Sequence, residues 1–266
     1  MTHAIKPLVY PIFSFSLVQQ SRRCIASRIK HLNVVVLKDE DGKMPTFKIQ
    51  IGNSILKTPR KAPLRIEDES LALAIANEWK SEMNKKKINL ANMHLTSLAY
   101  TATDNPFDET TEDIANAMLE YLKFDTVRFR DTDNEQLLHR QSRHWDPLIG
   151  WFEHNYNCHL PIEYGDITNT SSIPKATSDT LLRHLCSHKR WPLVGANFMI
   201  RNLKSFVLAT CLMDRFLNVQ QAVELARLET RFQVEKWSKV EWEHDLDEQC
   251  TSARVAAGAL FYHLSL

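Results

Sequence analysis

The chain has 266 residues, 44% of them hydrophobic and 24% charged, which is enough apolar material for one large domain or two modest ones and excludes disorder throughout. The formal net charge is +1, but six basic residues and no acid precede Asp39, so the rest of the chain is net acidic. A body of this sign is poorly suited to general nucleic-acid binding, which needs clustered lysine and arginine.

Residues 1–30 are predicted to be a mitochondrial transit peptide, because the stretch lacks acids and carries Arg and Ser residues. A secretory signal is the rival interpretation, since Leu8 to Val18 is largely apolar. The positive charges mainly follow this run, at Arg22, Arg23 and Arg28, and the five cysteines are odd in number and without close pairs. No later stretch reaches the ~20 apolar residues that span a bilayer. We therefore expect a mitochondrial-matrix protein that is not inserted in the membrane.

A β-rich segment is predicted after the leader. Its strands show β-branched runs or a period of two, and the two-residue turn Gly52-Asn53 joins two of them into a hairpin. Pro59 and Pro63 limit Ala62–Ile66 to an edge strand at most. The predicted strands are Leu32–Leu37, Thr46–Ile51 and Ser54–Thr58.

From Glu67 onwards the pattern predicts helices. Asp104-Asn-Pro106 ends the second of them, because the residue before a proline avoids helical geometry. Thr110-Thr-Glu-Asp113 is a helix start signal, and a break is expected near Pro147. The predicted helices are 67–79, 90–103, 110–123, 133–157, 177–189, 195–217, 219–236 and 241–264.

Strands and helices are thus segregated along the chain, which predicts the α+β class, with a small N-terminal β-rich domain followed by a C-terminal α-helical bundle. The expected division is a leader at 1–30, a β-rich domain with its linking helices at 31–107, and a helical domain at 108–266.

The glycine pattern argues against an enzyme that handles nucleotides. The chain has six glycines, and none lies within five residues of another, whereas phosphate-cradling loops need closely spaced glycines. No Gly-x-Ser-x-Gly elbow is present either. We expect no ATP hydrolysis, no cofactor and no catalytic residue.

The candidate metal and acid–base residues have simpler interpretations. His184 and His188 would share a helix face, but a third zinc ligand and the Glu of an H-E-x-x-H motif are missing. They are interpreted as polar residues on an exposed face. The acidic stretch at 241–248 is interpreted as a solvated helix start, and Trp237 and Trp242 as core residues. No metal site is predicted.

Eight short blocks carry a resemblance to a known family, in the family's order and at close to its spacing. These blocks are Ile55–Pro59, Leu71–Trp79, Met93–Leu98, Trp145–Leu148, Leu203–Leu208, Ala222–Glu229, Val240–Asp245 and Ala256–Phe261. From about Leu32 to Leu264 the chain resembles the ATP synthase F1 complex assembly factor 2 family, chaperones of the mitochondrial alpha subunit.

The resemblance implies a β-rich domain joined to a helical bundle, and no cofactor. It implies binding of unassembled alpha subunit, which is kept from aggregating until the beta subunit takes its place. We expect the chaperone to be a monomer. A lone subunit of an obligate ring exposes large apolar interfaces, so this activity is physically reasonable.

The resemblance also implies a contact residue, Glu229, the first acid of the family's Arg-Leu-Glu-Glu-Glu stretch. Here the stretch runs from Arg227 to Arg231, and Thr230 and Arg231 replace the two following acids. Arg227 and Trp79 complete the predicted partner-binding residues. The structural alternatives are a solvated helix position for Glu229 and domain packing for Trp79.

Two other functions stay open at this point. A small hydrolase would need a deep pocket that holds two titratable groups with strongly perturbed pKa values. A helical adaptor with another mitochondrial client would differ from the chaperone only in its partner.

Overall fold

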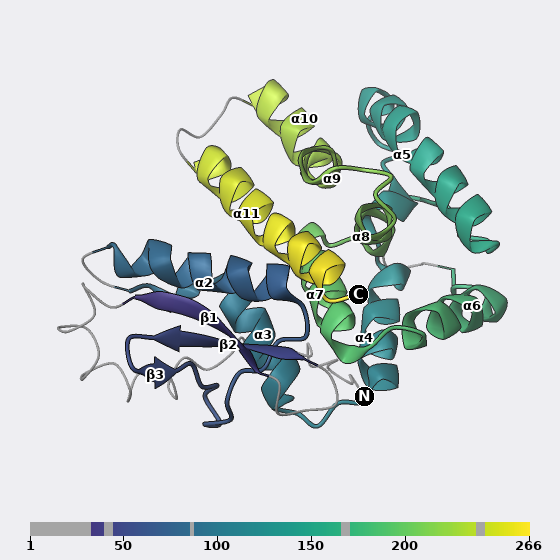
Figure 1. The fold of residues 1–266 in the computed structure, drawn as a ribbon. Coiled ribbons are helices and arrows are strands. Elements are labelled where there is room, and N and C mark those ends of the chain that lie inside the picture. The colour runs from purple at the N-terminus through teal and green to yellow at the C-terminus, as the bar shows by residue number, and fades with distance from the viewer. Residues whose placement is uncertain (1–32, 40–44, 86–87, 166–170, 238–242) are drawn as a thin grey trace, which may run out of the picture.

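The structure is a computed structural model that describes residues 33–39, 45–85, 88–165, 171–237 and 243–266 (Figure 1). The predicted leader and Trp242 lie outside these ranges. None of the described helices is long and apolar enough to cross a membrane. In chain order the elements are β1 (Val34–Asp39), β2 (Thr46–Ile51), β3 (Ser54–Ile55), α2 (Glu69–Met83), η2 (Leu90–Asn92), α3 (His94–Asp104), α4 (Thr111–Lys123), η3 (Thr126–Arg128), β4 (Phe129–Arg130), α5 (Glu135–Tyr156), β5 (Glu163–Tyr164), α6 (Lys175–Cys186), α7 (Arg190–Leu203), α8 (Phe206–Met213), α9 (Val219–Ala226), α10 (Leu228–Trp237) and α11 (Glu243–Leu264).

The predicted α+β class is confirmed, with an antiparallel sheet in the order β1-β2-β3 followed by helices. The hairpin at Gly52-Asn53 is also confirmed, and Gly52 adopts the positive φ of 60° that a tight turn requires. The Ala62–Ile66 segment pairs only through isolated bridges, of which Phe47 to Ile66 is one, as expected of a stretch that contains a proline.

Helix α2 is capped by Asp68, whose carboxylate accepts a hydrogen bond from Leu71 N at 2.8 Å. The predicted start of the next helix at Leu90 was wrong, because residues 90–92 form a separate 3₁₀ turn. Helix α3 starts later because Glu78 of α2 accepts hydrogen bonds from its first amides, at 3.0 and 2.8 Å. Asn105 ends α3 in the left-handed conformation.

Helix α5 is continuous, so the predicted break near Pro147 was wrong. A proline inside a helix cannot bond to the carbonyl four residues earlier, here that of Arg143. Both residues are exposed, so water can bond to that carbonyl instead.

The predicted single helix at 195–217 was also wrong, because it is divided into α7 and α8. Lys204 lies in the left-handed region at φ 54°, and Ser205 caps α8 by accepting from Leu208 N. The buried carboxylate of Asp125 accepts a second α8 amide, Val207 N, at 2.9 Å. These caps satisfy amides that a continuous helix would have bonded internally.

A further predicted helix, 219–236, is divided at Arg227 into α9 and α10. The side chain of Arg227 pairs with Asp247 and Glu248 of α11, far away in the sequence. The short parallel pair of β4 with β5 was not predicted. Two-residue strands are too short to show any hydrophobic period.

Two hydrophobic clusters form the interior. One is built from the sheet, α2 and α3, and the other from the helices that follow residue 110. Val194 of α7 and Phe261 of α11 belong to the first cluster, so two helices of the C-terminal half complete the N-terminal core. The domain boundary near residue 107 stays a prediction.

Helices α7 and α11 approach each other closely at two glycines. A Cβ atom added to Gly195 would lie 2.9 Å from the backbone nitrogen of Tyr262 and 3.0 Å from the carbonyl oxygen of Gly258. The absence of a side chain at Gly195 therefore permits contact between the two backbones.

Candidate functional site

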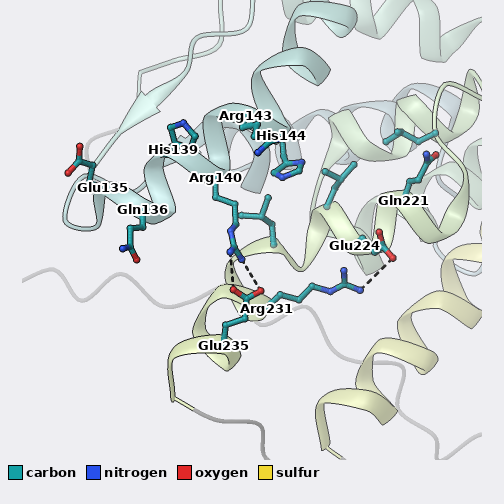
Figure 2. Close-up of a pocket in the computed structure, with 13 residues that line it drawn as sticks. Glu135, Gln136, His139, Arg140, Arg143, His144, Gln221, Glu224, Arg231 and Glu235 are labelled. Carbon is teal, nitrogen blue, oxygen red and sulfur yellow. Dashed lines mark hydrogen bonds and ion pairs between the residues drawn. The ribbon is translucent and has the colours of Figure 1, made fainter.

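A cleft of about 870 Å³ lies between α5 on one side and α9 and α10 on the other. Figure 2 shows that α5 presents polar side chains to it, and their numbers form two neighbouring rows, each with a spacing of four residues. The α5 residues that line the cleft are Glu135, Gln136, His139, Arg140, Arg143 and His144.

The cleft also has an apolar part, made by Leu217, Leu225 and Leu228. Leu228 is buried in the helical core, and the other two are partly buried against it. An apolar strip beside charged groups is the pattern of a site for an amphipathic segment, which places apolar side chains inward and polar ones at the rim.

One charged pair, Arg140 with Glu235, crosses the cleft and joins its two walls, and a second, Arg231 with Glu224, lies within the wall made by α9 and α10 (Figure 2). The Arg140 guanidinium donates to both carboxylate oxygens of Glu235, at 3.0 and 2.9 Å, and lies 5.2 Å from the ring centroid of Phe232. The hydrogen bonds from Arg140 lower the pKa of the Glu235 carboxyl. Arg231 bonds to Glu248 of α11 at 2.8 Å and lies 3.8 Å from Glu224. These pairs are half-exposed or exposed, so solvent weakens them.

Arg143 differs from these paired arginines. It is exposed, lines the cleft and forms no ion pair with any described residue. An unpaired guanidinium at the rim is available to bind a carboxylate of a partner.

Glu229 lies next to the cleft, on α10, and is half-buried. Its Oε1 atom accepts a hydrogen bond from Gln141 Nε2 at 2.7 Å, and Gln141 Oε1 in turn accepts from Asp131 N at 2.8 Å. Burial raises the pKa of Glu229, against the opposing effects of the Gln141 bond and of Arg130. The alternative interpretation of a merely solvated helix position was therefore wrong, because Glu229 ties α10 to α5.

The other two predicted contact residues lie elsewhere. Arg227 is only 11% exposed and faces α11, where it pairs with Asp247. Trp79 packs against the N-terminal cluster, and its indole nitrogen is buried without a hydrogen-bond partner among the described residues. Figure 1 shows α11 running between α2 and α10. The structure therefore does not join Glu229, Arg227 and Trp79 into one surface.

The histidine pair was expected on an exposed face, and this was wrong. His184 and His188 are half-buried, and His188 Nε2 lies 3.0 Å from the Tyr262 hydroxyl. His184 packs edge-on against Tyr156, with ring centroids 5.1 Å apart. Among the described residues, no group of three or more metal-binding side chains could hold an ion.

The comparison with protein families agrees with the resemblance found in the sequence. A family model described as ATP12 chaperone protein matches residues 30–153, which include the sheet and nearly all of α5. Over these residues the chain is similar to the ATP12 chaperone family. The resemblance predicted from the sequence is thus confirmed.

Relatives extend the ATP12 match beyond α5. The mitochondrial protein atp12 of Schizosaccharomyces pombe is 27% identical over 222 residues, covering 80% of this chain and 75% of its own length. The mitochondrial ATP12 of Saccharomyces cerevisiae is 24% identical over 257 residues, with 83% and 76% covered. The crystal structure of Atp12 from Paracoccus denitrificans has a TM-score of 0.77 at 26% identity, with 88% of this chain and 96% of that chain covered.

Sequence reasoning missed the cleft residues Arg140, Arg143 and Arg231. The spacing of Gln136, Arg140 and His144 on one helix face was a signal, but it is equally typical of any solvated face. The opposite wall could not be foreseen, because the division of α9 from α10 was not predicted.

Proposed function

We propose that this chain is an assembly chaperone for the catalytic sector of the mitochondrial ATP synthase, and that it binds the unassembled alpha subunit in the matrix. The family is described as a chaperone family, and the two yeast relatives are named as mitochondrial proteins. The resemblance of the sequence blocks supplies the alpha subunit as the client.

The cleft of α5, α9 and α10 is the observation that carries this proposal. A chaperone must cover an apolar surface of its client and later release it to the permanent partner. A strip of three leucines binds such a surface, and the half-exposed charged pairs around it limit the affinity because they are already partly satisfied by one another. The protein acts by binding as a monomer, without catalysis or a cofactor.

The direct test is suppression of aggregation. Purified alpha subunit is diluted from denaturant with and without the chaperone, and light scattering is followed. We expect scattering to fall as the molar ratio of chaperone to client approaches about one to one. Unchanged scattering at a severalfold excess would overturn the proposal.

Arg143→Glu tests the role of the cleft, because Arg143 is exposed and unpaired among the described residues. The reversed charge should weaken client retention by about tenfold while the unfolding midpoint stays unchanged. The matched control is Arg183→Glu, an exposed arginine on α6 that bonds only within its own helix. Equal effects of the two variants would exclude the cleft as the contact surface.

Glu229 remains a proposed contact, with Arg227 and Trp79. Glu229→Lys should lower client capture, but it places a cation near the buried Arg130. Glu229→Gln keeps the shape of the side chain, so it separates loss of charge from loss of fold. An unfolded Gln variant would mean that Glu229 has a structural role alone.

In cell extract, the tagged chaperone should recover free alpha subunit and not the assembled synthase. Native gels of the synthase with and without this protein measure the consequence for assembly. Recovery of the intact complex only would contradict an assembly role.

A further inference from the structure

The edge of the N-terminal sheet offers a second binding surface. Strand β1 forms one edge, opposite β3, and no described segment pairs with its outer side (Figure 1). Strand edges carry a row of backbone donors and acceptors that another strand can use.

The hydrogen-bond register shows which residues face outward. Gly52 N donates to Asn33 O at 2.8 Å, so these two residues form a bonded pair. Bonded pairs alternate along an antiparallel ladder, so Val35 and Leu37 also bond to β2, while Val34 and Val36 direct their N–H and C=O groups away from it.

The other side of β2 agrees with this assignment. Phe47 exchanges backbone hydrogen bonds with Ile66 at 2.7 and 3.0 Å, and Ile49 O accepts from Leu56 N at 2.8 Å. Phe47 and Ile49 therefore bond away from β1, as their position opposite Lys38 and Val36 requires.

The side chains of β1 are divided between the two faces of the sheet. Val34 is buried and Val36 partly buried in the N-terminal cluster, where α2 packs on the sheet. Val35 and Leu37 point to the opposite face and are 47% and 38% exposed. The edge thus combines backbone groups that pair with no described strand and apolar side chains beside them.

Proteins normally protect such an edge with a proline, a charge, a bulge or a very short strand. Here β1 has six residues in unbroken register with β2, and Val34–Leu37 contains neither proline nor charge. Lys38 and Asp39 supply charge only where the strand ends. This edge is open in the described part of the chain.

We propose that the β1 edge binds an extended segment of the client by adding it to the sheet as a further strand. An apolar patch fits many shapes, but outward N–H and C=O groups at every second residue fit a second extended backbone. The segment is expected to present apolar side chains at alternate positions, next to Val35 and Leu37. The identity of the client as alpha subunit rests on the proposed function.

Residue-resolved hydrogen exchange on the full chain tests this. In the free chaperone the outward amides of Val34 and Val36 should exchange rapidly, in contrast with the bonded amides of Val35 and Leu37. On addition of unassembled alpha subunit, the outward amides should slow by about tenfold or more.

A proline substitution provides an independent measurement. Val36→Pro removes an outward N–H and no bond to β2, whereas Val36→Ala shortens the same side chain and keeps the N–H. The dissociation constant of the client should rise about three- to tenfold for the proline variant relative to the alanine variant, as expected for one lost hydrogen bond. Thermal unfolding of both variants checks that they fold. If the proline variant does not fold, the hydrogen-exchange measurement still tests the proposal, because it uses the unaltered chain.

The outcomes separate the two proposals. If the client is held but the Val34 and Val36 amides do not slow, strand addition is wrong and the chaperone proposal stands. If the client is not held at all, the chaperone proposal fails and strand addition to this client fails with it. Slow exchange of these amides already in the free protein would also overturn the inference. In that case sedimentation would show what covers the β1 edge: a monomer would indicate another segment of the same chain, and a dimer would indicate a second copy.

Discussion

The contact between α7 and α11 and the contact between α5 and α10 are built in opposite ways. The first is apolar and buried: Gly195 lies against the α11 backbone, and the rings of Trp191 and Phe261 stack with centroids 5.5 Å apart. The second is polar and partly exposed, and it depends on Arg140 with Glu235 and on Gln141 with Glu229.

The difference separates a fixed framework from an adaptable surface. Backbone contacts at glycines tolerate no shift, because close-packed atoms have no alternative arrangement. An exposed ion pair such as Arg140 with Glu235 can exchange its partners with water at small cost. We therefore expect changes at α7–α11 to affect stability, and changes at α5–α10 to affect client binding.

The largest effect is expected from Gly195→Ala. The new methyl group would meet backbone atoms at 2.9 and 3.0 Å, so the two helices must separate. The free energy of unfolding should fall by about 2–3 kcal/mol in chemical denaturation. The control is Gly150→Ala on α5, where no atom lies within 4 Å of the new carbon, and which should gain about 0.5–1 kcal/mol. A stable Gly195→Ala variant would show that this contact is not rigid.

The next largest effect is expected from Glu78→Ala, which tests a polar contact inside the N-terminal framework. Glu78 accepts from two backbone amides of α3 and from the Thr96 hydroxyl at 2.6 Å. Its loss leaves those donors unsatisfied, so the free energy of unfolding should fall by about 1–3 kcal/mol. The control is Glu69→Gln, which changes an exposed acid in the first turn of the same helix. It should change the free energy of unfolding by less than about 1 kcal/mol. Similar values for the two would mean that Glu78 does not cap α3.

A pH-dependent effect is expected at Glu229. Burial raises its pKa above that in the unfolded chain, so the folded protein holds this proton more tightly. The protonated carboxyl therefore favours folding; the contribution is complete below the unfolded pKa and is lost as pH rises through the folded pKa.

Wild type and Glu229→Gln should be compared by chemical denaturation from about pH 7 to about pH 4. The stability of wild type relative to the variant should increase as the pH falls. A difference that stays constant, or moves in the opposite direction, would show that burial does not dominate at Glu229.

The smallest effect on stability is expected from Glu235→Gln. The carboxylate is exposed and its pKa is lowered by hydrogen bonds from Arg140, but solvent screens the pair. The thermal midpoint should be unchanged within measurement error, while client retention changes. A clear drop in the midpoint would mean that the α5–α10 contact also belongs to the framework.

The structure shows what residues in two of the family's sequence blocks do in the fold. In Leu71–Trp79, Glu78 caps α3 and Trp79 packs on the N-terminal core. In Trp145–Leu148, the buried Trp145 donates to Leu225 O and Asp146 pairs with the buried Arg130. Resemblance alone located these blocks, but it did not distinguish residues that maintain the fold from residues that contact a client.

Local chemistry was enough for the elements whose ends depend on neighbouring residues. The turn at Gly52, the capping box at Thr110 and the left-handed end at Asn105 are all readable from short segments, because the stabilising group lies within four residues. The α+β class followed from the order of such segments.

By itself the sequence determined the class, the hairpin and the starts of most helices, since these depend on periodicity, turn residues and local caps. Only the tertiary structure decided the breaks before α8 and α10, the burial of Glu229 and the existence of the cleft. Each of these depends on partners far away in the chain: Asp125 with Val207, Arg227 with Asp247, and Gln141 with Glu229. Such contacts override local helix propensity because one hydrogen bond contributes about 0.5–1.5 kcal/mol, whereas the preference of one residue for continuing a helix is below about 1 kcal/mol.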